Sequence, residues 1–243
     1  MQWWTTTEPS TSKPLDVSPA LSPSRVEKLL ACPMQAVLER MSGLDESLDM
    51  IYGAMAHAYF EALGNGVDDT EALDATVAAR RAADNAPEWK VERDIADFQA
   101  MLERAHGWLQ ASRGAFEQVA VEADVNVQVS DNVRIRGRLD RLERDSSGAV
   151  HIVDLKTSAY PPTVDATADN PQLATYQLAL AHGEFDGGKV VTARDGANAL
   201  SVGGAVLVYP NANKTTLSTR EQAMKTADEL DELAAALDGL PEE

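Results

Sequence analysis

Two aspartates and a lysine in the middle of the chain carry the clearest chemical signal. Within residues 134–157, two segments of alternating apolar residues flank a turn at 145–148, a pattern that predicts a β-hairpin. If the hairpin folds symmetrically about the turn centre, Asp140 and Asp154 lie opposite each other. Lys156 is two residues beyond Asp154, so it projects from the same face. The sequence therefore predicts that two carboxylates and an amine converge.

This group of side chains suits two roles. Adjacent carboxylates repel each other, so a folded protein holds them best with a bound cation or with one of them protonated. Oxygen ligands of this kind suit Mg²⁺ or Mn²⁺, and the lysine would then position a water or offset charge in a transition state. Alternatively, Asp and Lys alternate on the solvent face of many hairpins and form ordinary surface pairs. The hairpin alone supports both interpretations.

Periodic apolar residues predict the elements that position this hairpin. A strand at 119–129 leads into it and carries Glu122 as a secondary candidate. The segment 183–204 has the character of a loop. Helix starts are indicated at Ser22-Pro23, or at a capping box of Ser24 and Glu27, and at Asn170-Pro171. The remaining predictions are helices at 22–31, 34–43, 49–63, 69–84, 88–111, 171–181 and 219–237, and a strand at 206–209.

Two of the predicted helices carry further candidate side chains. His57 shares a helix face with Gly53 and Glu61, so it is either a partly buried histidine paired with Glu61 or a metal ligand. Gln172 and Tyr176 are four residues apart on one face. They are placed either to hydrogen-bond a phosphate or base edge, or to serve as polar edges of a packed helix.

Composition limits the classes of protein to consider. The chain has 243 residues, 44% of them hydrophobic and 25% charged, as is ordinary for a soluble globular protein. It contains no run long enough to cross a bilayer and no secretory signal, so we expect a cytoplasmic protein without membrane contact. The net charge of −18 argues against a general nucleic-acid coat, although it permits local contacts. Residues 1–20 have the composition of a linker or tail, in which Trp3 and Trp4 suggest docking to a partner or onto this domain.

Five short segments, in order, resemble the RecB-like nuclease domains of the PD-(D/E)XK superfamily. The resemblance runs from about Leu21 to Tyr209 and implies an α/β restriction-endonuclease-like fold for a domain at 21–243. In that fold a central mixed sheet around the 119–156 strands is flanked by helices, with a helical N-terminal arm. The segments that carry it are 21–24 with 32–33, 53–57, 137–141, 154–157 and 172–176.

The resemblance also implies a site and an activity. The metal ligands would be His57, Asp140, Asp154 and the carbonyl of Leu155, and Lys156 would be catalytic together with the two aspartates. Gln172 and Tyr176 would contact DNA or brace the lysine. The implied function is Mg²⁺- or Mn²⁺-dependent hydrolysis of DNA, as an exonuclease in double-strand-break resection and repair. The alternatives are an inactive DNA-binding or scaffold module with the same fold, and a hydrolase of another phosphodiester.

The resemblance further implies partners. The tail and the tryptophan pair fit a domain from the C-terminal end of a bacterial helicase-nuclease, so we expect a helicase to deliver single-stranded DNA ends. Positive charge gathers along the hairpin, where it would guide the substrate strand. The residues concerned are Arg134, Arg136, Arg138 and Arg141, of which the first three share the face of Asp140.

An iron-sulfur cluster is expected to be absent. Many relatives place a cysteine at the position of Cys32 and three more after the Gln-Tyr helix, but this chain has no cysteine after Tyr176. Cys32 is then expected to be a small buried side chain. We predict that the purified protein is colourless and free of iron, because one thiol cannot hold a cluster. Elemental analysis and a visible spectrum test this, and stoichiometric iron with a visible band would contradict it.

Overall fold

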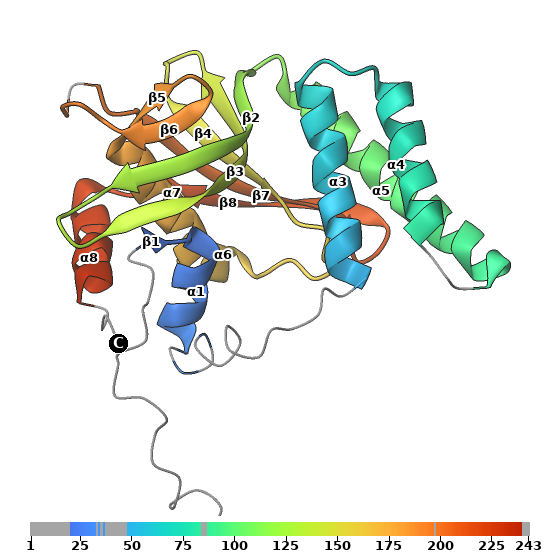
Figure 1. The fold of residues 1–243 in the computed structure, drawn as a ribbon, viewed down its shortest axis with the longest axis horizontal. Coiled ribbons are helices and arrows are strands. Elements are labelled where there is room, and N and C mark those ends of the chain that lie inside the picture. The colour runs from blue at the N-terminus through green and yellow to red at the C-terminus, as the bar shows by residue number, and fades with distance from the viewer. Residues whose placement is uncertain are drawn as a thin grey trace, which may run out of the picture.

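The structure is a computed structural model that describes residues 20–32, 34, 36, 48–83, 87–196 and 198–239. These residues form an eight-stranded mixed sheet with helices on both faces (Figure 1). The α/β restriction-endonuclease-like fold class is thereby confirmed. The predicted tail, its tryptophan pair and most of the helix predicted at 34–43 lie outside the described residues.

The sheet has the order β5-β6-β2-β3-β4-β7-β8, with β1 paired to β3. Strands β2, β3 and β4 form an antiparallel meander, whereas β1 on β3, β6 on β2 and β7 on β4 are parallel pairs. The hairpin predicted around the central turn therefore forms the middle of the sheet. The strands are β1 Ala20–Leu21, β2 Phe116–Gln128, β3 Arg134–Asp145, β4 Val150–Leu155, β5 Gly183–Asp186, β6 Lys189–Thr192, β7 Val202–Ala212 and β8 Thr216–Ala223.

Helices cover the sheet in two layers. One core lies between the sheet and α1, α7 and α8, and the other lies under α3, α4 and α5. Ser22 caps α1 by accepting a hydrogen bond from the Arg25 N–H, so the first of the two predicted helix starts is used. Asn170 caps α7 as predicted. The helices are α1 Pro23–Ala31, α3 Leu48–Gly64, α4 Asp69–Ala83, α5 Glu88–Ser112, α6 Val164–Ala168, α7 Pro171–Ala181 and α8 Ala227–Asp238.

Two predictions in the C-terminal third were wrong. The segment expected to be a loop contains the β5-β6 hairpin, whose turn uses Gly187 and Gly188 at φ 57° and 86°. The helix expected at 219–237 begins only at Ala227, because β8 precedes it. Strand β8 is polar, and its buried Gln222 is satisfied by donating to carbonyls that include that of Thr167. A polar strand of this kind lacks the apolar alternation that sequence patterns detect.

Cys32 was also mispredicted, since its side chain is exposed. It is the C-cap residue of α1, whose buried face is formed by Pro23 and Val26. Cys32 therefore points away from the core to which α1 contributes.

Arg141 is the exception among the four arginines that the sequence singled out on this strand, because it is buried rather than available to a substrate. Its Nε donates to Glu143 Oε1 at 2.6 Å and its Nη1 donates to Gln118 Oε1 at 2.7 Å. Arg141 is 7% exposed and Glu143 is 3% exposed. The two form a buried ion pair whose role is structural.

We predict that Arg141→Ala destabilises the protein by about 3–5 kcal/mol, because it leaves Glu143 buried without its partner. The double variant Arg141→Met/Glu143→Leu should recover most of that loss, since it removes both charges and keeps the volume. Urea unfolding measures each free energy of unfolding, with Arg136→Ala on the same strand as the exposed control. Equal losses in the single and double variants would show that the charge pair is not the cause.

Candidate active site

Three carboxylates occupy one row across the centre of the sheet. Arg141 pairs with Val153 on β4 and with Val121 on β2. The preceding residue on β3, Asp140, therefore lies opposite both Asp154 and Glu122. The hairpin register predicted from the turn is therefore confirmed.

The backbone of β2 bends at Glu122, so alternate side chains before and after this residue face different helical layers. Its φ is 47°, in the left-handed region that non-glycine residues adopt only at a cost of about 1–3 kcal/mol. Val121 lines a cavity beside α5, whereas Ala123, two residues later, belongs to the core under α7. Residues two apart in a regular strand share a face, so the strand crosses between layers at Glu122. The acidic row lies at this crossing.

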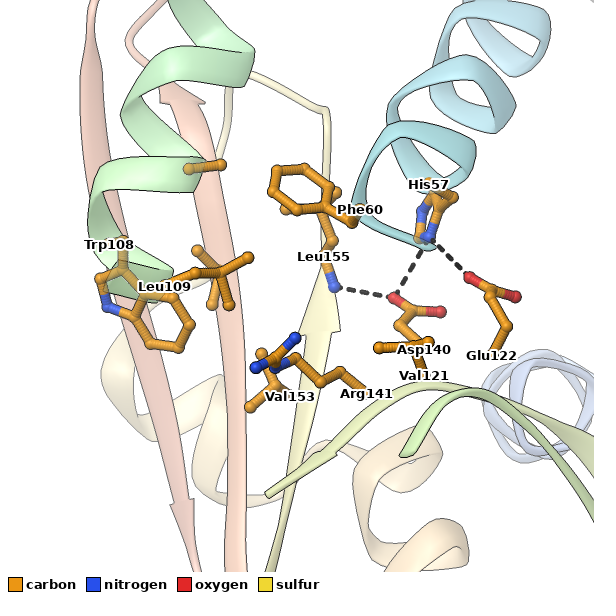
Figure 2. Close-up of a pocket in the computed structure, with 12 residues that line it drawn as sticks. His57, Phe60, Trp108, Leu109, Val121, Glu122, Asp140, Arg141, Val153 and Leu155 are labelled. Carbon is orange, nitrogen blue, oxygen red and sulfur yellow. Dashed lines mark hydrogen bonds and ion pairs between the residues drawn. The ribbon is translucent and has the colours of Figure 1, made fainter. Parts of the chain in front are cut away.

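Helix α3 brings His57 to two of these carboxylates. Its Nδ1 lies 3.5 Å from Asp140 Oδ2 and 3.7 Å from Glu122 Oε1, and the Leu155 N–H donates to Asp140 Oδ2 at 2.8 Å (Figure 2). The candidate ligand atoms of His57, Glu122 and Asp140 all lie within 4.8 Å of one another. The structure thus gives His57 these two acidic partners in place of the predicted Glu61. It also places Glu122, a secondary candidate from sequence, among the principal residues.

Asp154 and Lys156 form the other side of the site. Asp154 is 4% exposed, and its Oδ2 lies 2.8 Å from Lys156 Nζ. Among the described residues, none makes a hydrogen bond of favourable angle to Asp154 Oδ2 in addition to this ion pair. Lys156 Nζ also donates to Gln172 Oε1 at 3.1 Å. Asp154 lies outside the compact group around His57, but its Oδ2 remains under-satisfied and buried.

These residues line an open pocket of about 420 Å³. Tyr176 lies at its edge and its hydroxyl donates to the Arg138 carbonyl at 2.6 Å, so α7 is tied to β3. Arg136, which the sequence grouped with Arg138, is not part of the lining. Of the predicted site residues, the pocket brings together His57, Asp140, Asp154, Leu155, Lys156, Gln172, Tyr176 and Arg138.

A small apolar cavity of about 30 Å³ lies behind the acidic row. Phe60, Trp108 and Leu109 form part of its wall (Figure 2). Such a wall keeps water away from one side of the carboxylates and strengthens the electrostatic interactions among them.

The electrostatics follow from burial and crowding. Burial, and next the charge of Asp154, raise the pKa of Asp140 to about 7, against the opposing effect of His57. Burial alone would lower the pKa of His57, but Glu122 and Asp140 outweigh it and the pKa is raised. Burial likewise opposes the charge on Lys156, yet Asp154 raises the lysine's pKa. The site therefore favours added positive charge.

The exposed arginines follow β3 away from the pocket. Arg138 Nε lies 3.4 Å from Asp124 Oδ1, and Arg138 Nη1 lies 3.8 Å from Glu122 Oε2. Lys189 Nζ on β6 lies 3.4 Å from Asp124 Oδ2. Arg134 donates to Gln128. Arg134, Arg138 and Lys189 thus each have a polar or acidic neighbour, which weakens their attraction for distant anions.

Comparison with known proteins adds a family to this geometry. The solved structure described as "Crystal structure of SSO0001" is similar at 17% sequence identity over 90% of this chain and 85% of that chain. Its TM-score of 0.30 supports no further conclusion. A search of proteins with curated descriptions finds no significant match. The family profile of the PD-(D/E)XK nuclease superfamily matches residues 20–242, and the chain therefore belongs to that superfamily.

Proposed function

We propose that this protein is a divalent-metal-dependent DNA nuclease of the RecB-like type. The observation that supports this best is the convergence of Asp140, Asp154, His57 and Lys156 in one open pocket, with Glu122 next to His57. The superfamily implies nuclease chemistry and a DNA substrate. A binding or scaffold module that had lost catalysis would have no need to keep a buried, self-repelling row of carboxylates.

The donor set fits a hard divalent cation. Carboxylate and carbonyl oxygens with one imidazole suit Mg²⁺ or Mn²⁺, and the buried Asp154 has Lys156 as its positive neighbour at 2.8 Å. His57, Asp140, Asp154, the Leu155 carbonyl and Glu122 are the residues that would hold it. When bound, such a cation acts as a Lewis acid and lowers the pKa of water.

The residues around the metal ligands divide the remaining work. Lys156 is held between Asp154 and Gln172, so its ammonium is fixed at the pocket wall, where negative charge would build up on a phosphate. Gln172 acts as a positioning residue for that lysine. Tyr176 uses its hydroxyl to hold the Arg138 backbone, which favours a bracing role over direct contact with DNA.

Finer aspects of the function rest on the family resemblance. We propose an exonuclease that acts on DNA ends during break resection, with a helicase as the delivering partner and the cytoplasm as its location.

Within the described residues, no helix combines the length and apolar character needed to cross a bilayer.

Nuclease assays with each substitution test the proposed roles. Asp154→Asn and Lys156→Gln should each lower the cleavage rate by about 100-fold or more, since each removes a charge that acts on the reacting phosphate. The exposed Asp131→Asn on the β2-β3 turn is the matched control and should cleave at the wild-type rate. Circular dichroism checks that each variant is folded. Wild-type activity in Asp154→Asn, or undiminished cleavage in chelator, would reject the proposal.

The burial of Asp140, together with the nearby charge of Asp154, predicts an unusual pH dependence of stability without metal. The pKa of Asp140 in the folded protein, about 7, lies above its ordinary value, so its contribution to stability is full below about pH 4 and is lost as pH rises toward 7. Asp140→Asn cannot ionise and should therefore raise the free energy of unfolding at pH 8 by roughly 1–3 kcal/mol.

Thermal unfolding of both proteins at pH 4.5 and pH 8 in chelator measures this difference, which should shrink at the lower pH. Excess Mg²⁺ or Mn²⁺ should stabilise the wild type more than the variant, because the cation offsets the negative charge of Asp140, which the variant lacks. A variant less stable than the wild type at pH 8 would contradict the assigned repulsion.

A further inference from the structure

The most exposed large hydrophobic side chain in the described part of the chain is that of Tyr160, at 79%. A single exposed aromatic residue is unremarkable on most surfaces. Its position is what sets Tyr160 apart, because it lies on the loop that joins β4 to α6, immediately after the residues of the pocket.

The loop starts inside the candidate active site. Lys156, Thr157 and Ser158 all line the 420 Å³ pocket, and Tyr160 is two residues beyond Ser158. Two residues of chain span at most about 7 Å. The backbone of Tyr160 therefore lies beside the rim of the pocket, within about 7 Å of that of Ser158.

The β7-β8 hairpin fixes this loop through its backbone. The Asn213 N–H donates to the Ala159 carbonyl at 2.9 Å, and Arg220 Nε donates to the Pro162 carbonyl at 2.7 Å. These anchors lie on both sides of Tyr160, and the following Pro161 restricts the backbone further. The ring is thus presented to solvent by a pre-positioned loop, which lowers the entropic cost of binding through it.

We infer that Tyr160 is a stacking platform for an unpaired base next to the scissile phosphate, so the preferred substrate is single-stranded or frayed DNA. This inference rests on the proposed nuclease function. Aromatic side chains bind single strands by stacking on bases without regard to sequence. Bases inside a duplex already stack on their neighbours and offer no free face, so only an unpaired nucleotide can use this ring.

Charge supports the same conclusion. The chain carries a net charge of −18, and Arg138 at the pocket already has acidic neighbours. Attraction to phosphates is therefore local, and a strand needs a contact that does not depend on charge. An exposed ring at the rim supplies one.

The test is binding of a fluorescein-labelled single-stranded oligothymidylate to the full chain in chelator, where no metal-dependent cleavage occurs. Tyr160→Ala should weaken binding by about 10-fold, whereas Tyr160→Phe, which keeps the ring, should bind like the wild type. Trp89→Ala is the matched control, because Trp89 is 72% exposed on α5 and, unlike Tyr160, does not follow residues that line the pocket. An oligonucleotide of the same length with abasic sites should bind the wild type and Tyr160→Ala equally.

Equal affinity of Tyr160→Ala and Trp89→Ala for oligothymidylate would overturn the inference, as would the same loss on the abasic strand. Cleavage rates separate this result from the proposed function. A chain that cleaves DNA but is indifferent to Tyr160 refutes only the stacking role. A chain that shows Tyr160-dependent binding but no metal-dependent cleavage refutes only the nuclease.

Discussion

Repulsion among three carboxylates in one row is the constraint on which the rest of the site depends. Glu122, Asp140 and Asp154 lie on adjacent strands, and the backbone pairing that aligns them cannot relax without breaking the middle of the sheet. Two basic side chains limit the cost: His57 lies against one end of the row and Lys156 against the other. They do not remove it, because burial, and next the charge of Asp154, still raise the pKa of Asp140. A row balanced in this way is poised to accept further positive charge.

Packing outside the site holds the strained residue of this row in place. Glu122 keeps its positive φ because the flanking chain is fixed: Val121 packs against the glycine that ends α3, and Gln118 donates to that residue's carbonyl. A side chain at Gly64 would collide with Val121. Local strain at the site is thus balanced by packing outside it, as is typical of functional positions.

Features that nearby residues determine could be predicted from the sequence, whereas features that depend on distant contacts could not. The register of Asp140 and Asp154 follows from a turn a few residues away, and the start of α7 follows from Asn170 and its proline, so both were correct. The central role of Glu122 depends on a left-handed backbone conformation that alternating residues do not reveal. Arg141 was grouped with the exposed arginines by its charge, and its burial depends on Glu143 and on Gln118 of another strand. Strand β8 was missed because its buried position is the polar Gln222, which is satisfied by distant carbonyls and by the side-chain amide of Gln177.

The charge distribution constrains how such a chain would hold a nucleic acid. Salt-dependent binding needs several free positive groups along the backbone track, yet Arg138 and Lys189 share Asp124, and Arg141 is buried with Glu143. Long-range attraction is then weak, and an acidic surface repels strands that approach elsewhere. If the proposed function holds, binding would come from short-range contacts at the pocket: a cation balanced by the acidic row, the ammonium of Lys156, and stacking on Tyr160. These contacts act only on a strand that has already entered the pocket, so delivery and chemistry would be separate steps, and a partner that feeds the strand would raise the rate without altering the site.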